Sequence, residues 1–277
     1  MLQSILIALD GSPFSDAATE LGIRWAKRFD ARLHALGIVD EPEIRGGEAT
    51  GIGGSAYSKQ IDEAQMADAQ AKVATFLDRF EAKCRSASVR FARTAVVGAP
   101  RVEILAAAPR HDIVVLGRRT YFHFETQQKP DDTLEEILHR PPRPVVAAPN
   151  PVAKEGPVLV AYDGSPEAAR ALQTAQCLGL LAGQEVHVVS IRADRIRARE
   201  QADCAVAYLS AHDVDATAHA VGSGDAAGPL LLEQAAGVGA GLIVMGAYGP
   251  RSLGERLFGS VTQSVLDDAT IPLFLYH

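Results

Sequence analysis

The sequence has few of the features that mark secreted, zinc-binding or membrane-spanning proteins. Its 277 residues include three cysteines, Cys84, Cys177 and Cys204, with no C-x-x-C pair among them. Neither a disulfide framework nor a zinc knuckle is therefore indicated. No apolar run approaches the roughly 18 residues of a membrane span, and no leader-like segment precedes the first predicted strand. We expect a cytoplasmic protein with no membrane partner.

Positive charge and catalytic motifs are also scarce. Lysine and arginine total 27 against 34 acidic residues, a net charge of −7, whereas a nucleic-acid-coating protein needs a basic face for phosphates. We expect no nucleic-acid partner. The sequence has no G-x-S-x-G elbow, no G-x-x-x-x-G-K-[ST] loop and no H-E-x-x-H helix, so no motif supplies a nucleophile with its base.

The chain does contain an internal repeat. ILIALDGSP at residues 5–13 reappears as VLVAYDGSP at residues 158–166. Further on, HDIVVLG in the first half matches AGLIVMG in the second, and each half ends in a proline-led apolar segment. A turn-rich stretch, 149–157, separates the halves. We predict two tandem domains, 1–150 and 157–277.

Within each half, apolar segments of strand length alternate with segments of helical periodicity. Ala18, Leu21, Trp25 and Phe29, for example, recur at the spacing of one helical face. This alternation predicts a parallel sheet covered by helices on both faces and wound in both directions. The glycine-rich segment 40–58 is expected to be a loop. In such a sheet a ligand binds outside the carboxyl ends of the strands, where the strand order reverses.

A glycine pattern follows the fourth predicted strand of the second half. It reads Gly246-x2-Gly249-x9-Gly259-Ser260 and leads into a predicted helix. Free N–H groups and the positive dipole end of a helix start favour an anion, and the Ser260 hydroxyl adds a donor. Gly246 alone is as consistent with a simple chain turn, but the full spacing is more specific. The pattern predicts a phosphate site.

This spacing resembles the nucleotide-binding signature of the universal stress protein family, in its tandem two-domain form, over nearly the whole chain. The resemblance implies two doubly wound, five-stranded parallel sheets of the adenine nucleotide alpha hydrolase-like, Rossmann-like kind, arranged as a pseudo-dimer. It also implies that ATP is bound. The residues it places against phosphate and ribose are Gly246, Gly249, Gly259, Ser260 and Val261, with Met245 beside them.

The same resemblance places adenine near Ile191 and Ala161 and sets Asp163 against the nucleotide, where Mg²⁺ commonly accompanies the phosphates. From the residues alone, Asp163 is also consistent with a local Asx turn, and Ile191 with a plain core residue. A carboxylate near phosphates requires a divalent cation or a ribose hydroxyl in between. The family also pairs domains through their last strands, here Pro144–Ala148 and Pro272–Tyr276, and a further homodimer is plausible.

The two halves are not equivalent at this site. Thr120 replaces the second glycine in the first half, and alignment from the final strands sets Asp132 against Gly259 and Thr133 against Ser260. Asp131 and Asp132 suit a helix start but repel a second anion there. We therefore predict a single nucleotide site, in the C-terminal half. His123 and Glu125 lack a third ligand at a fixed spacing, so a solvated loop is favoured over a metal pair.

The leading hypothesis is an ATP-binding regulatory or stress-tolerance protein whose nucleotide state alters a surface for an unidentified protein partner. One alternative is a partner-binding scaffold with a vestigial nucleotide site. Another is a slow ATP hydrolase, for which Asp163 is the one candidate acid–base group beside the glycine loop. The sequence does not decide between ATP, AMP and another ligand.

Overall fold

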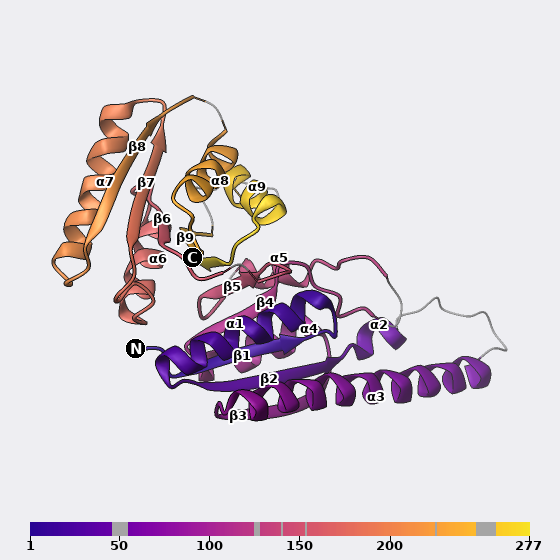
Figure 1. Ribbon diagram of the computed structural model, residues 1–277. Coiled ribbons are helices and arrows are strands. Elements are labelled where there is room, and N and C mark those ends of the chain that lie inside the picture. The colour runs from indigo at the N-terminus through magenta and orange to yellow at the C-terminus, as the bar shows by residue number, and fades with distance from the viewer. Residues whose placement is uncertain (46–54, 125–127, 140, 153, 225, 248–258) are drawn as a thin grey trace. The chain divides into compact units, whose positions relative to one another are not determined.

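The computed structural model describes the 277-residue chain except for residues 46–54, 125–127, 140, 153, 225 and 248–258 (Figure 1). The chain forms two compact units. The N-terminal unit comprises Gln3–Arg143, and the C-terminal unit comprises Met1–Leu2 with Pro144–His277. Among the described residues, no helix combines the length and the apolar character needed to cross a membrane.

The N-terminal unit is built on four parallel strands in the order β3-β2-β1-β4. The strands are β1 (Ser4–Leu9), β2 (Arg32–Val39), β3 (Phe91–Val97) and β4 (Ile113–Gly117). The helices are α1 (Pro13–Phe29), α2 (Glu41–Arg45), α3 (Ser55–Ala87), α4 (Pro100–Ala107) and α5 (Thr133–Leu138), with a 3-10 turn at Ala108–Arg110. Apolar side chains fill β1 and β4, which makes these two strands almost wholly buried.

Helix α1 shows how the repeated D-G-S-P segment folds. Ser12 caps the helix by accepting a hydrogen bond from the Ser15 amide at 3.2 Å, and Pro13 occupies the first helical position. Both residues act as predicted, since a proline there loses no intrahelical bond. Gly11 adopts a φ of 75°, which only glycine takes without strain.

The C-terminal unit has six strands in the order β5-β10-β9-β6-β7-β8. They are β5 (Val145–Ala148), β6 (Val158–Ala161), β7 (Val186–Arg192), β8 (Ala216–Gly222), β9 (Leu242–Gly246) and β10 (Leu273–Tyr276). The helices are α6 (Pro166–Cys177), α7 (Arg195–Ser210), α8 (Ala227–Gly237) and α9 (Ser260–Asp268). Five strands run parallel, and β5 pairs with β10 in the antiparallel sense. The predicted pairing of these two proline-led segments is therefore confirmed.

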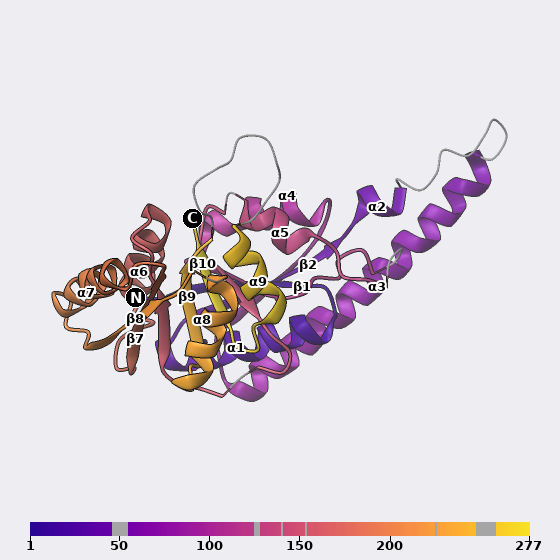
Figure 2. The same cartoon turned by 90° about the horizontal axis from the view of Figure 1, so that it is seen from above.

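The fifth strand of the first half, β5, lies in the compact C-terminal unit, so the contact boundary falls between Arg143 and Pro144. The domain bounds 1–150 and 157–277 follow the internal repeat and stay a prediction. One feature differs from the sequence prediction. The expected loop 40–58 is partly helical, because α2 occupies Glu41–Arg45 and α3 begins at Ser55. Helix α3 has 33 residues and reaches past the ends of the neighbouring strands in both views (Figures 1 and 2).

The strand order of the C-terminal unit fixes where a ligand can enter. Strand β6 lies between β7 and β9, so the chain winds to one side of β6 and then to the other. The carboxyl ends of β6 and β9 therefore flank the switch point at which doubly wound sheets hold their ligands.

Candidate functional site

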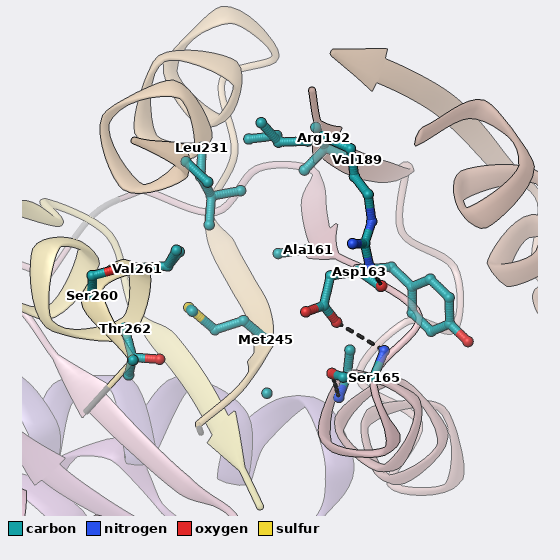
Figure 3. A pocket seen from close by; sticks show the side chains of 16 residues that line it. Ala161, Asp163, Ser165, Val189, Arg192, Leu231, Met245, Ser260, Val261 and Thr262 are labelled. Carbon is teal, nitrogen blue, oxygen red and sulfur yellow. Dashed lines mark hydrogen bonds between the residues drawn. The ribbon is translucent and has the colours of Figure 1, made fainter. Parts of the chain in front are cut away.

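A pocket of about 280 Å³ opens at this switch point in the C-terminal unit (Figure 3). Eight of the nine residues predicted from the sequence line it, and the ninth, Gly249, lies outside the described residues. The eight are Ala161, Asp163, Ile191, Met245, Gly246, Gly259, Ser260 and Val261. Segments separated by about 100 residues of sequence thus converge on one cavity, near the lower end of the roughly 300–1,000 Å³ typical of ligand pockets.

The middle of the pocket is apolar. Val189, Leu231 and Met245 reach it from β7, α8 and β9 and are each at most 5% exposed. Val261 and Ala161 complete this lining. An apolar middle of this kind holds a flat ring by burial of surface, while orientation must come from the polar groups at its ends.

One polar end is the start of α9. Gly259 is the N-cap residue and provides no side chain to bond the first amides, and the first turn contains no acidic residue. The first amides of a helix have no intrahelical acceptor and lie at the positive end of the dipole. Ser260 is exposed at this end and Thr262 is buried. Among the described residues, the α9 start therefore offers donors and meets no competing carboxylate.

The opposite end is formed by the second copy of the D-G-S-P segment (Figure 3). Oδ1 of Asp163 accepts the Ser165 amide at 3.0 Å, and Ser165 Oγ caps α6 by accepting the Ala168 amide at 3.1 Å. The Asx-turn alternative for Asp163 is thus observed, and Gly164 supplies the required positive φ of 77°. Only one carboxylate oxygen is used; Oδ2 has no partner among the described residues.

Arg192, which the sequence analysis did not select, also lines this end. Its Nε donates to Oε1 of Gln201 at 2.6 Å, and its Nη2 donates to the backbone oxygen of Asp163. The available signal was its place directly after Ile191 at the end of a predicted strand. The lining residues that sequence reasoning missed are Tyr162, Ser165, Ala168, Val189, Arg192, Ala227, Leu231 and Thr262.

Burial raises the pKa of the Tyr162 phenol, and the neighbouring Cys204 and Asp163 act in the same direction. The phenol therefore stays protonated at neutral pH, and its hydrogen-bonding partner is Cys204 of α7.

Gly246 owes its lack of a side chain to packing. A Cβ atom at this position would lie 2.8 Å from the Ala168 amide nitrogen and 2.9 Å from the Glu167 carbonyl carbon, at the start of α6. Gly117 meets the start of α1 in the same way, with Phe14 Cβ at 2.6 Å. In both units, therefore, the start of a helix packs so closely on the last residue of a strand that only glycine fits there. The helix is α6 over β9 in the C-terminal unit and α1 over β4 in the N-terminal unit.

The corresponding end of the N-terminal unit confirms the predicted equivalence of the two helix starts. Asp132 is the N-cap of α5 and Thr133 its first residue, as Gly259 and Ser260 are for α9. The carboxylate that meets this helix start belongs to Asp131. It accepts the Thr133 amide at 3.0 Å, the Thr120 hydroxyl at 2.5 Å and the Phe122 amide at 2.5 Å.

The chain also fills the rest of this crevice. Asp10 accepts the Tyr121 amide at 2.8 Å, and burial raises the pKa of its carboxyl group although several hydrogen bonds oppose the shift. Phe122 is 1% exposed. The cavity left beside Phe122 measures about 10 Å³, which is room for one water molecule at most.

The metal alternative for this loop finds no support in the described residues. His123 Nδ1 lies 2.6 Å from Oδ2 of Asp40, and this hydrogen bond is the main reason why the pKa of His123 is raised. Glu125 lies outside the described residues. Among the residues described, no three His, Cys, Asp or Glu side chains group in a way that could hold a metal ion.

Comparison with known proteins agrees with this architecture. The structure resembles a universal stress protein from Archaeoglobus fulgidus DSM 4304, with a TM-score of 0.74, 22% identity, and 99% of this chain and 97% of that chain covered. It also resembles a putative universal stress protein from Pseudomonas aeruginosa UCBPP-PA14, with a TM-score of 0.63, 15% identity and coverages of 99% and 93%. These likenesses establish the fold. No curated protein matches the chain.

The sequence itself matches a family model twice. The model described as "Universal stress protein family" covers residues 1–149 and again residues 156–277. Together the two matches account for nearly the whole chain, one for each copy of the internal repeat. The chain therefore belongs to the universal stress protein family.

Proposed function

We propose that the C-terminal unit binds ATP, and that the protein acts in the stress response as a nucleotide-dependent regulator in the cytoplasm. The phosphates lie at the start of α9, and the base lies in the apolar middle toward Ala161 and Ile191. The observation that carries this proposal is the convergence of eight predicted residues on one pocket with a glycine-capped helix start at one end.

The α9 and α5 helix starts differ in their charged neighbours, as a single nucleotide site in the C-terminal unit requires. The α9 start has a glycine cap and no acid in its first turn, whereas the α5 start is met by the Asp131 carboxylate. A phosphate and a carboxylate compete for the same amides and repel each other. We therefore assign the nucleotide to the C-terminal unit alone.

The residues present are also compatible with Mg²⁺ carried by the nucleotide. Mg²⁺ keeps several waters and is commonly held by one or two carboxylates together with phosphate oxygens. Asp163 is the only carboxylate among the described lining residues, and its Oδ2 is unused. Because Asp163 lies at the end of the pocket opposite the α9 start (Figure 3), Mg²⁺ on the phosphates would take its ligands from phosphate and water, and Oδ2 would remain available to another part of the nucleotide.

Titration calorimetry of the full chain with ATP and Mg²⁺ tests the proposal. Gly259→Asp places a carboxylate at the α9 start and is expected to weaken ATP binding at least about a hundredfold, or about 2.7 kcal/mol. Gly237→Asp adds the same charge at the end of α8, where a Cβ meets nothing within 4 Å, and should leave the affinity within about twofold.

The outcomes separate the alternatives. No heat from the wild-type chain at millimolar ATP would overturn the proposal and favour the partner-binding scaffold. ATP binding with release of phosphate that stops in Asp163→Ala would favour the slow hydrolase. Equal weakening by Gly259→Asp and Gly237→Asp would show that net charge, and not the α9 start, governs binding.

A further inference from the structure

Arg192 is the only positively charged side chain among the described residues that line the C-terminal pocket. It lies beside Asp163, on the side of the pocket opposite Ser260 and Thr262 (Figure 3). A cation placed to bind the terminal phosphates would be expected beside the α9 start. Its position at the other end indicates a different role.

The Arg192 guanidinium is held in place by hydrogen bonds to two residues, Gln201 and Asp163. Gln201 of α7 accepts the Arg192 Nε hydrogen through Oε1 at 2.6 Å, and the same oxygen accepts the hydroxyl of the buried Ser190 at 3.1 Å. The backbone oxygen of Asp163 accepts a hydrogen from Nη2. A planar group with two fixed bonds is already ordered, so little rotamer entropy remains to be lost when it meets a ligand.

Donor capacity remains after these bonds. A guanidinium carries five N–H groups, of which one on Nε and one on Nη2 are used, which leaves three. Those three have no acceptor among the described residues. Asp163 Oδ2, on the same side of the pocket, likewise has no donor there. A fixed donor and a fixed acceptor thus adjoin each other at one end of an apolar pocket.

The N-terminal unit provides an internal comparison. The paired registers of β1 with β2 and of β6 with β7 make Val39 the counterpart of Arg192 and Gly37 the counterpart of Ser190. Phe76 lies over Gly11, where Gln201 lies over Gly164. In the N-terminal unit, whose crevice is filled, the counterparts of Arg192, Ser190 and Gln201 are thus apolar residues or glycine.

We infer that Arg192 is a specificity-determining residue that, together with Asp163, contacts the edge of the nucleobase. The ligand class is a nucleotide whose base presents an amino group beside a ring nitrogen, as adenine does. Asp163 accepts from the amino group, and Arg192 donates to the ring nitrogen. Gln201 is the positioning residue that holds the guanidinium. The inference rests on the proposed nucleotide site and adds the means by which a base is distinguished from phosphate alone.

The test compares ATP with inorganic tripolyphosphate, which has the phosphates and no base, by calorimetric titration of the full chain in the presence of Mg²⁺. Arg192→Met is expected to weaken ATP binding at least about tenfold, the range of a lost hydrogen bond to a charged group, and to change tripolyphosphate binding less than twofold. Arg195→Met removes the same charge three residues away, outside the pocket lining, and should change neither.

Two further variants address the geometry. Arg192→Lys keeps the charge but loses the planar fork, and is expected to lose at least about threefold in ATP affinity with tripolyphosphate unchanged. Gln201→Leu removes the acceptor that holds Arg192 Nε and should also weaken ATP binding. Gln201→Glu keeps an acceptor oxygen at this position and should retain the wild-type affinity. Arg192→Lys also keeps the test informative if the methionine variant fails to fold.

The outcomes are distinct. Equal losses for ATP and tripolyphosphate would overturn the inference, because Arg192 would then act on the phosphates. An unchanged ATP affinity in Arg192→Met would overturn it as well, while leaving the proposed function intact. A wild-type chain that binds neither probe would instead refute the proposed function together with the inference.

Discussion

The N-terminal unit depends on Asp131 for its closed crevice, and replacing this residue by asparagine tests that dependence. The Asp131 carboxylate accepts hydrogens from Thr133 N, Phe122 N and Thr120 Oγ1, and its Oδ2 lies 3.4 Å from the His123 amide nitrogen. Asparagine has nearly the same shape but only one acceptor oxygen. Its NH₂ group would face at least one N–H donor that now has a carboxylate oxygen.

The expected change in the free energy of unfolding follows from these hydrogen bonds. Hydrogen bonds to a charged group contribute about 1.5–3 kcal/mol each, and a buried donor left without an acceptor costs about 1–3 kcal/mol. Asp131 is half-buried, so water recovers part of this loss. We expect Asp131→Asn to lower the free energy of unfolding of the N-terminal unit by about 2 kcal/mol.

Asp132→Asn is the matched control. Asp132 is exposed and its side chain makes no capping bond, so the same change one residue away should stay within about 0.5 kcal/mol. Urea unfolding gives the overall effect, and amide hydrogen exchange at Phe122 and Thr133 reports the local one. Equal effects of the two substitutions, or unchanged exchange at Phe122 in Asp131→Asn, would refute the assignment of Asp131 as the group that closes the crevice.

Two pH dependences follow from the histidines of the N-terminal unit. The pKa of His123 is raised by its hydrogen bond to Asp40, with Asp131 and Glu43 adding to the effect; its stabilising contribution is therefore complete below the unfolded value of about 6.5 and lost as pH rises through the folded value. Unfolding measured above pH 6 should show this loss in the wild type and not in His123→Gln. Burial, with His34 and Arg110, lowers the pKa of His111 to about 4, so its contribution is lost as pH falls from about 6.5 toward 4. A His111 midpoint near 6.5 in an NMR titration would contradict this.

Much of the fold could be predicted from the sequence because the two halves contain the same motifs in the same order, so each predicted element is supported by two segments. The D-G-S-P segment predicts its own turn, cap and helix start, and Ser12 and Ser165 both act as caps. The start of α3 could not be predicted, since the glycines of segment 40–58 favoured a loop throughout. Helix α3 nevertheless begins at Ser55, directly after the last of them, where residues of ordinary helix propensity resume.

The candidate site was predictable wherever spacing along one segment fixes position. The equivalence of Asp132 with Gly259 came from counting residues back from the last strands, and the two N-caps confirm it. Counting does not show which side chain turns toward the helix start, and that residue is Asp131. The role of Arg192 could not be predicted for a related reason, because its partners Gln201 and Asp163 come from two other segments.

The two halves can be understood as two ways to satisfy the same helix start. Unpaired amides at the end of a helix need an anion or water. In the N-terminal unit the acceptor is covalently attached, two residues before the Thr133 amide that it bonds, so its effective concentration is fixed by the chain and no solute dilutes it. In the C-terminal unit the cap is Gly259, which has no side chain to offer. A ligand that binds only the folded state stabilises it by an amount that grows with its concentration. On the proposed function, nucleotide concentration therefore governs the stability of the C-terminal unit, while the N-terminal unit, which carries its own carboxylate, is indifferent to it.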